Sequence, residues 1–216
     1  MASEMVYDCR RSDLGRFAGM DADMRFDVMN RFTGAVQFTA EINCDDYASR
    51  STKLGLAARW AVKSKANLTG ANLTGARLSG AELSGASLFQ ANLFRADLTL
   101  ANLTEADLTR ASLSRADVEG TNLTGVNLTG VDFNGTTGVN DHIKCIQIDT
   151  YPITYTADVI QIGCQRHTHR KWAEFNDAQI RHMDGEKAVE WWARYKAWLF
   201  RTIEICPATP TQESKL

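Results

Sequence analysis

The sequence of residues 66–135, ANLTG-ANLTG-ARLSG-AELSG-ASLFQ-ANLFR-ADLTL-ANLTE-ADLTR-ASLSR-ADVEG-TNLTG-VNLTG-VDFNG, is a five-residue phrase repeated fourteen times. The first position of the phrase is small, and the second is polar, most often Asn or Asp. The third position is large and apolar in every phrase: Leu68, Leu73, Leu78, Leu83, Leu88, Leu93, Leu98, Leu103, Leu108, Leu113, Val118, Leu123, Leu128 and Phe133. Self-similarity at a fixed period predicts a repeat architecture.

A period of five fits neither the alternation of a half-buried strand nor the 3.6-residue spacing of a helix face. A chain that turns a corner after every phrase still directs each third-position side chain to a common axis. Four such sides close a square coil, and fourteen phrases make three and a half coils, roughly 17 Å at about 4.8 Å per coil. Backbone groups then pair between coils, which leaves only two open ends. The pattern predicts a mainly β fold, a quadrilateral β-helix.

This pattern, A(D/N)LXX, resembles the pentapeptide repeat family, and the resemblance implies a right-handed, four-sided β-helix. The flanks resemble those of pentapeptide repeat proteins from bacteriophages and prophages, in residues 31–34, 36–41 and 53–57 before the repeats and in residues 160–168 after them. Among such relatives, some resemble duplex DNA in shape and charge and bind DNA gyrase, and dimerisation through C-terminal helices also occurs.

The composition predicts three regions, namely an N-terminal arm with strands and a capping helix (1–65), the repeats (66–135), and a C-terminal strand and helix domain (136–216) that caps the other end. Residues 31–42 read as a strand or hairpin because apolar and polar residues alternate there. Ser51 or Thr52 is expected to cap a helix that runs through Ser64. The apolar residues of this helix lie on one face, which is suited to cover the first coil of the repeats.

Strands are expected around Ile143–Ile148 and Tyr155–Ile162, followed by three helices. The first two are expected near 168–175 and 177–183, the second with Asn176 and Gln179 as a capping box. The third runs from about Glu186 to Cys206, where Pro207 stops it. Its apolar arc spans roughly 220° at 100° per residue. The excess apolar surface can pack on the neighbouring helices or on a second copy of the chain, and the second choice predicts a dimer interface at Trp191, Tyr195 and Trp198.

Charge and cysteine content narrow the function classes. Residues 1–65 carry ten Lys/Arg and nine Asp/Glu, residues 66–135 four and seven, and residues 136–216 ten and ten. No region is basic enough to suggest direct nucleic-acid binding. Five irregularly spaced cysteines, no apolar run of membrane-spanning length and no signal-peptide pattern predict a cytoplasmic protein of a bacterial or phage-infected cell.

No catalytic constellation, phosphate loop or metal-ligand spacing is found, so the sequence predicts no enzyme, no cofactor and no metal. Cys164, His167, His169 and His182 are too irregularly spaced for a zinc site. Two candidate binding regions remain. Phe89, Phe94 and Leu100 occupy outward positions on successive sides of the second coil and form a candidate interaction patch. Arg166, His167, His169, Arg170 and Lys171 precede a helix start and form a candidate anion site.

These features favour a non-enzymatic scaffold for protein interactions, or an inhibitor of a host macromolecule, with a protein partner and a possible homodimer. The alternative is a phage counter-defence protein that sequesters a nucleotide-type ligand, with the basic cluster as its phosphate contact. A lesser alternative is a DNA mimic that binds gyrase. Duplex DNA carries about ten charges over 17 Å, and the repeats carry a net charge of only −3.

Overall fold

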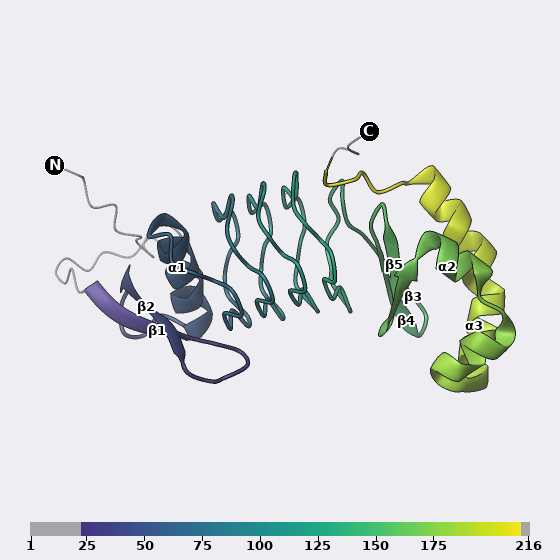
Figure 1. The fold of residues 1–216 in the computed structure, drawn as a ribbon, viewed down its shortest axis with the longest axis horizontal. Coiled ribbons are helices and arrows are strands. Elements are labelled where there is room, and N and C mark those ends of the chain that lie inside the picture. The colour runs from purple at the N-terminus through teal and green to yellow at the C-terminus, as the bar shows by residue number, and fades with distance from the viewer. Residues whose placement is uncertain (1–22, 213–216) are drawn as a thin grey trace. The chain divides into compact units, whose positions relative to one another are not determined.

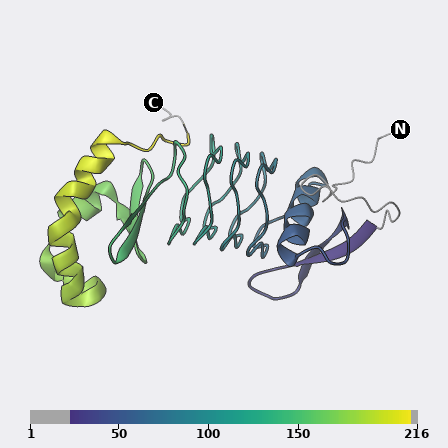
Figure 2. The ribbon, with the colours of Figure 1, turned by 180° about the vertical axis from the view of Figure 1, so that it is seen from behind.

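The computed structural model describes residues 23–212 and divides the chain into two compact units. The first unit holds the repeats, the segment before them, and residues 211 and 212. The second unit spans Val139–Pro210. Within the described residues, no helix is long and apolar enough to cross a membrane. Figures 1 and 2 show the coiled repeats from two opposite directions.

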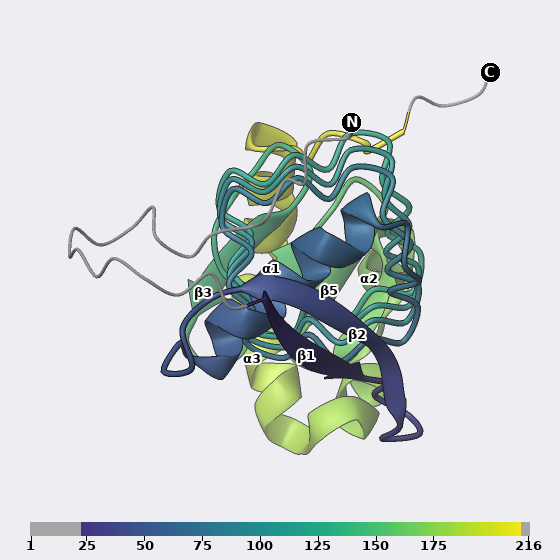
Figure 3. The ribbon, with the colours of Figure 1, turned by 90° about the vertical axis from the view of Figure 1, so that its left-hand side faces the viewer.

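The repeats form coils of twenty residues. Parallel bridges join residues twenty apart, from Asn72 and Asn92 to Asp117 and Thr137. Between neighbouring coils, the Leu73 N–H donates to the Asn92 carbonyl at 2.8 Å and the Asn92 N–H donates to the Ala71 carbonyl at 2.9 Å. Twenty residues are four phrases, so the predicted four-sided coil is confirmed for this segment. Figure 3 views the repeats along the axis of the coils, and the successive coils superimpose in this view.

Each phrase makes one side of a coil, and phrases twenty residues apart share a side. The first side comprises residues 66–70, 86–90, 106–110 and 126–130; the second 71–75, 91–95, 111–115 and 131–135; the third 76–80, 96–100, 116–120 and 136–138; the fourth 81–85, 101–105 and 121–125. The third-position residues fill the axis, and Leu73, Leu93 and Leu113 are 0% exposed. Burial of each leucine contributes about 1.5–3 kcal/mol before chain entropy is subtracted.

Two local hydrogen bonds explain the composition of the phrase. At each corner, the N–H of the next phrase donates to the third-position carbonyl, as Ala71 does to Leu68 at 3.0 Å. The residue between them at position five has positive φ, for example +69° at Gly70, which is the pattern of a type II turn and favours glycine. The second-position side chain accepts from the fourth-position N–H, as Asn67 Oδ1 does from Thr69 at 2.8 Å. Asn and Asp make such turns readily.

The N-terminal segment forms an antiparallel hairpin and a helix. Strands β1 (Asp23–Met29) and β2 (Val36–Asn43) pair from Asp23 with Asn43 to Met29 with Val36. In the connection, Asn30 Oδ1 accepts from the Phe32 and Thr33 N–H groups. Helix α1 (Arg50–Lys63) follows, with Ser49 as its N-cap instead of the expected Ser51 or Thr52, because Ser49 Oγ accepts from the Thr52 N–H.

The hairpin and α1 both contact the first coil. The Asn72 N–H donates to the Met29 carbonyl, at the end of β1. On α1, the Ser51 carbonyl accepts from the Arg77 N–H at 3.0 Å, and Arg59 Nη2 donates to the Ser79 carbonyl at 2.7 Å. A Cβ atom added to Gly55 would lie 1.9 Å from the Arg77 carbonyl oxygen. The helix therefore approaches the coil as closely as its backbone allows.

At the other end of the repeats, residues 211 and 212 bind the corner between the fourth and first sides. The Gly125 N–H donates to the Thr211 carbonyl, and Thr211 Oγ1 donates to the Val126 carbonyl at 2.7 Å. In the preceding coil, the equivalent Glu105 N–H donates to the Thr124 carbonyl, nineteen residues further along the chain. Thr211 thus occupies a position that the next coil would fill if the repeats continued.

The second unit is a four-stranded antiparallel meander with helices. The strands, in spatial order, are β3 (Lys144–Ile148), β4 (Tyr151–Tyr155), β5 (Val159–Ile162) and β6 (Gln165–Thr168). Helix α2 (His169–Glu174) follows with Thr168 as N-cap. The hydrophobic core of the second unit includes Trp172, Trp191, Trp192 and Leu199.

Helix α3 (Asp177–Ile205) is interrupted at Asp184 and Gly185, whose backbones are not helical. This break falls between the two helices that the sequence predicts at 177–183 and from about 186. The capping box of Asn176 and Gln179 is present, which confirms that prediction. Cys206 is the C-cap, directly before Pro207, as expected.

Candidate functional site

A run of strained backbone marks the middle coils of the repeats. Position five of the phrase has positive φ throughout, and most phrases use glycine there. Six consecutive phrases instead carry a larger residue with φ between 55° and 59°: Gln90, Arg95, Leu100, Glu105, Arg110 and Arg115. A residue with a side chain in this conformation costs on the order of 1 kcal/mol relative to glycine. The middle coils therefore keep these side chains at a cost to stability.

Three of these six residues are arginines that flank the second side. Arg95 and Arg115 lie at one edge of that side, and their Cζ atoms are 5.1 and 5.8 Å from the centroid of the Phe94 ring. Arg110 precedes Ala111, so it lies at the other edge. All three arginines are exposed, and Phe94 is half-buried. We call these four residues, Phe94, Arg95, Arg110 and Arg115, the arginine face.

Charge is distributed unevenly around the coils. The third and fourth sides carry a net −4, from Arg77 against Glu82, Asp97, Glu105, Asp117 and Glu119. The first and second sides carry a net +1, from Arg95, Arg110 and Arg115 against Asp107 and Asp132. Asp132 is engaged locally, because its Oδ2 accepts from Ser114 Oγ at 2.5 Å. The small net charge of the repeats is thus the sum of acidic third and fourth sides and slightly basic first and second sides.

The three residues of the predicted interaction patch lie on three successive sides. Phe89 belongs to the first side and is half-buried, and Phe94 belongs to the second side. Leu100 belongs to the third side and is 70% exposed. Its Cδ2 atom lies over Gly120, 2.7 Å from where a Cβ atom would stand. Phe94 is the member that lies among charged neighbours, and the contact role of all three stays a prediction.

Replacing Leu100 with glycine should stabilise the fold by about 0.5–1 kcal/mol, because the substitution relieves the positive-φ backbone while removing a side chain that buries little surface. Urea unfolding of the two proteins measures the difference. Gly80 lies in the same column, with φ +60° and nothing within 4 Å of an added Cβ. Gly80→Ala should therefore show the opposite sign. If both substitutions lower the midpoint, position five is not strained as described.

Four of the five residues of the predicted anion site, His167, His169, Arg170 and Lys171, each make a different local contact. His167 Nε2 is buried, and the ring packs edge-on against Trp172 and Phe175. Burial and, secondly, the neighbouring Lys171 lower the pKa of His167. His169 Nε2 lies 2.9 Å from the Thr156 carbonyl oxygen.

Two further contacts of this cluster are also local. Arg170 Nε donates to Glu174 Oε1 at 2.8 Å, one turn further along α2. Lys171 Nζ lies 5.3 Å from the Phe175 ring. His167 therefore packs in the core beside exposed charges, and anion binding by Arg166, His167, His169, Arg170 and Lys171 stays a prediction.

The residues of the predicted dimer interface differ in exposure. Trp191 is 6% exposed, and its ring lies 5.3 Å from Tyr151 and 5.1 Å from Tyr195. Tyr195 is half-buried, and Trp198 is 42% exposed. Trp191 thus packs within its own unit, Trp198 remains available at the surface, and dimerisation stays a prediction.

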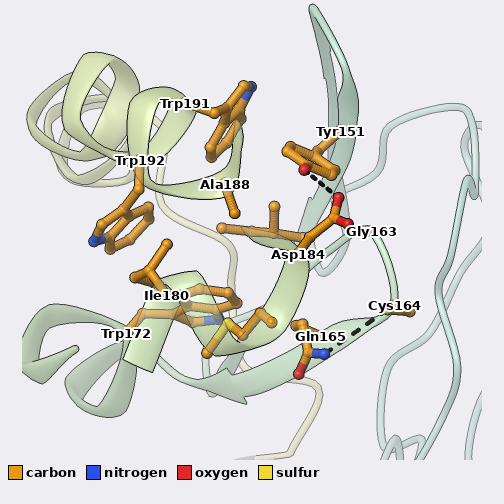
Figure 4. A pocket seen from close by; sticks show the side chains of 12 residues that line it. Tyr151, Gly163, Cys164, Gln165, Trp172, Ile180, Asp184, Ala188, Trp191 and Trp192 are labelled. Atoms are coloured by element: carbon orange, nitrogen blue, oxygen red, sulfur yellow. Dashed lines mark hydrogen bonds between the residues drawn. The ribbon is translucent and has the colours of Figure 1, made fainter. Parts of the chain in front are cut away.

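The second unit contains a partly open cavity of about 220 Å³, and Asp184, one of the residues that line it, is exposed. Figure 4 shows its walls, which come from α2, both halves of α3, β4 and the turn between β5 and β6. The lining is mainly apolar and aromatic: Ile162, Trp172, Ile180, Met183, Ala188, Trp191 and Trp192. Polar groups lie on one part of the wall: Tyr151, Cys164, Gln165 and Asp184. None of the five basic residues of the predicted anion site lines this cavity.

A hydrogen bond joins two residues of this wall. The Tyr151 hydroxyl donates to Asp184 Oδ2 at 2.5 Å (Figure 4). Burial and this hydrogen bond raise the pKa of Tyr151 to about 12, so Tyr151 is protonated at neutral pH. Among the described residues, no group of three or more His, Cys, Asp or Glu side chains is arranged to hold a metal ion.

Sequence reasoning missed Tyr151 and Asp184. The available signal was the Asp184-Gly185 pair, which interrupts an otherwise helical apolar pattern. A break of this kind brings a carboxylate to the end of one helix and the start of the next, where it can face a neighbouring strand.

Comparison with known proteins agrees with the geometry of the coils. The family model described as pentapeptide repeats matches residues 66–105 and 101–137. Residues 66–137 are pentapeptide repeats. Pentapeptide repeats fold as right-handed β-helices, which is the handedness that the resemblance to the family implies. No match to the chain is found among curated proteins.

Several solved pentapeptide repeat proteins are similar to this domain. Rfr23 from the cyanobacterium Cyanothece 51142 is 38% identical over 32% of this chain and 47% of its own, with a TM-score of 0.31. HetL from Nostoc sp. strain PCC 7120, involved in the regulation of heterocyst differentiation, is 38% identical over 32% of this chain and 34% of its own, with a TM-score of 0.26.

A pentapeptide repeat protein of the Arabidopsis thaliana thylakoid lumen is 35% identical over 35% of this chain and 55% of its own, with a TM-score of 0.19. The chain thus spans about a third to just over half of the length of these proteins. The match to the family covers the repeats alone, so the resemblance of the flanks to phage and prophage proteins stays a prediction.

Proposed function

We propose that the pentapeptide repeat domain is a rigid, non-enzymatic scaffold that binds an acidic surface of a partner protein through the arginine face. The observation that carries this proposal is the run of side chains at position five. Glycine suits the positive φ of this position, and the outer phrases use it. Backbone strain that a simple substitution would relieve is typical of functional sites.

The chemistry of the arginine face fits an anionic partner. Arginine forms bidentate hydrogen bonds with carboxylates, and it stacks on aromatic rings, as Arg95 and Arg115 do on Phe94. Aromatic and arginine side chains are also enriched among the residues that dominate binding energy at protein interfaces. The backbone bonds between coils fix the spacing of the three arginine backbones, so no backbone has to be ordered on binding.

Two features count against a DNA mimic that binds gyrase. The arginine face is positive where a DNA mimic needs negative charge, and the repeats as a whole carry a net charge of only −3. The acidic third and fourth sides also carry Arg77 among their carboxylates. The resemblance of the flanks to phage and prophage proteins supports a bacterial host protein as the partner, in the cytoplasm of the infected cell.

The proposal assigns a capping role to the N-terminal segment. Exposed coil ends present unpaired backbone groups and apolar side chains, and solenoids cover them with atypical terminal elements. Three hydrogen bonds support this role. Arg77 of the first coil donates to α1, Arg59 of α1 donates to the first coil, and Asn72 of the first coil donates to the end of β1. A cap at this end keeps the coils from pairing with other chains and leaves the outer sides free for the partner.

Reversing the charge of the arginine face should weaken partner binding at least about tenfold, because like charges across an interface repel. The test is affinity capture from bacterial lysate with the wild type and with Arg95→Glu/Arg115→Glu. The captured protein is then titrated in purified form at low and high salt, and binding should fall steeply with ionic strength.

The matched control is Arg77→Glu, which changes an exposed arginine on the acidic third side. This variant should bind the captured protein as the wild type does. If the Arg77 variant loses binding and the Arg95/Arg115 variant retains it, the partner uses a different side and the proposal is wrong. If both variants lose binding equally, the net charge of the repeats determines the affinity, and the assignment to the arginine face is wrong.

A further inference from the structure

The cavity of the second unit has the size and walls of a small-molecule site. An apolar cavity of about 150 Å³ is large enough to hold benzene, and this cavity measures about 220 Å³. Its volume therefore suits a bicyclic ring. Trp172 and Trp192, whose ring centroids are 5.2 Å apart, line it together with Ile180. Mostly apolar walls with few polar groups are typical of ligand sites.

The polar part of the wall is centred on a carboxylate that the backbone holds in an unusual conformation. Asp184 has φ −154° and ψ 40°, and Gly185 has φ 68° and ψ −160°, inside what is otherwise one helix. Arg181 and Glu186 form an ion pair across this break, with 2.7 Å between Nε and Oε2. The break directs Asp184 toward Tyr151 on β4, as Figure 4 shows. A continuous helix would not present the carboxylate in this way.

Among the residues that line the cavity, the Tyr151 hydroxyl donates a hydrogen bond to Asp184. A carboxylate accepts several hydrogen bonds, so Asp184 retains capacity for a ligand. Lys187 Nζ lies 6.0 Å from the Tyr151 ring and does not line the cavity. The cavity wall thus offers a negative charge beside aromatic faces, a combination that attracts organic cations.

We propose that this cavity binds a small aromatic amine, with its ring packed against the wall that Trp172, Trp192 and Ile180 form and its ammonium group on Asp184. The ammonium forms a charge-assisted hydrogen bond with the carboxylate, which is about twice as strong as a neutral one. An anionic ligand of the same size is repelled by Asp184. The proposal concerns the second unit alone and does not depend on the function of the repeats.

Three probes that share the indole ring and differ in charge test the proposal by isothermal titration calorimetry on the full chain. Tryptamine, the cation, should bind with Kd on the order of 10–100 μM, as expected for about twelve non-hydrogen atoms. Indole, which is neutral, should bind at least about tenfold more weakly, and indole-3-acetate, the anion, more weakly still. No heat from any probe at millimolar concentration overturns the proposal, and so does equal binding of indole and tryptamine.

Two substitutions separate recognition of charge from a structural role. Asp184→Asn should weaken tryptamine binding by about tenfold to a hundredfold and remove its advantage over indole. Tyr151→Phe removes the partner of Asp184 inside the protein and should leave tryptamine binding unchanged or tighter. If Tyr151→Phe weakens binding as much as Asp184→Asn does, the hydrogen bond is structural and the proposed role of Asp184 is wrong.

A third variant keeps the test valid should Asp184→Asn fail to fold. Ala188 is buried and lines the cavity, so Ala188→Leu fills part of it without changing any charge. Cavity-filling substitutions of this kind commonly keep or raise stability. The variant should fold and lose tryptamine binding, and retained binding would place the ligand elsewhere and overturn the assignment.

Discussion

Replacing Gly55 with alanine should lower the free energy of unfolding of the first unit by about 3 kcal/mol or more, because the new methyl group has no space. Its Cβ would lie 1.9 Å from the Arg77 carbonyl oxygen and 2.9 Å from the carbonyl carbon. Both atoms belong to the backbone of the first coil, which cannot yield without losing the bond from the Arg77 N–H to the Ser51 carbonyl. Helix α1 must therefore move away from the coil.

The sign of this effect distinguishes contact from helix propensity. In an exposed helix, glycine to alanine is stabilising by about 1 kcal/mol, so propensity alone predicts a more stable variant. Gly80→Ala serves as the control, because it adds the same methyl group in open space at φ +60° and should cost only about 1 kcal/mol. Urea unfolding measures all three proteins. A Gly55→Ala variant as stable as the wild type would show that α1 does not lie against the coil.

The features that follow from a strict period or from local chemistry could be predicted from the sequence. The five-residue repeat predicted the four-sided coil, because a strand or a helix would place many of the third-position leucines in water. Asn176 and Gln179 predicted a helix start, and Pro207 predicted a helix end, because both act on the backbone within a few residues. The sequence also indicated the position of the break near Asp184, as a boundary between two helices.

Features that depend on long-range contact could not be predicted in this way. Gly55 lies in a helix, where its sequence neighbours give no reason for glycine; the reason is Arg77, twenty-two residues further along the chain. The pairing of Thr211 with Gly125 joins residues eighty-six apart. The expected helix cap at Ser51 or Thr52 was wrong by two or three residues, because Ser49 satisfies the same capping chemistry and its side chain accepts from the Thr52 N–H.

The candidate sites show the same division. Outward positions of the repeat were assigned correctly to successive sides, since position alone determines the side. The sequence does not single out the arginine face, because the positive φ at position five is visible only in the backbone angles of the folded coils. The Tyr151–Asp184 pair was missed because β4 and the break in α3 come together only in the folded unit.

Replacing Leu98 with alanine should lower the free energy of unfolding by about 3–5 kcal/mol, which is the upper part of the range for a leucine in a close-packed core. Leu98 is 0% exposed and lies in the same axial column as Leu78 and Val118, twenty residues before and after it. Coils above and below are joined by backbone bonds, such as that between the Leu98 N–H and the Asp117 carbonyl at 2.8 Å. Because these bonds hold the coils apart, the axis cannot collapse into the space that alanine leaves.

Leu100 provides the matched control, since it is a leucine two residues away on the same side and is 70% exposed. Leu100→Ala keeps the strained backbone and removes little buried surface, so the free energy of unfolding should change by no more than about 0.5 kcal/mol. Each coil contacts only its neighbours, so a defect in the middle of the stack weakens the coils on both sides of it. Hydrogen exchange should therefore accelerate across residues 76–120 in the Leu98 variant. Equal losses for the two leucines would mean that the third-position side chains do not form the axis of the coils.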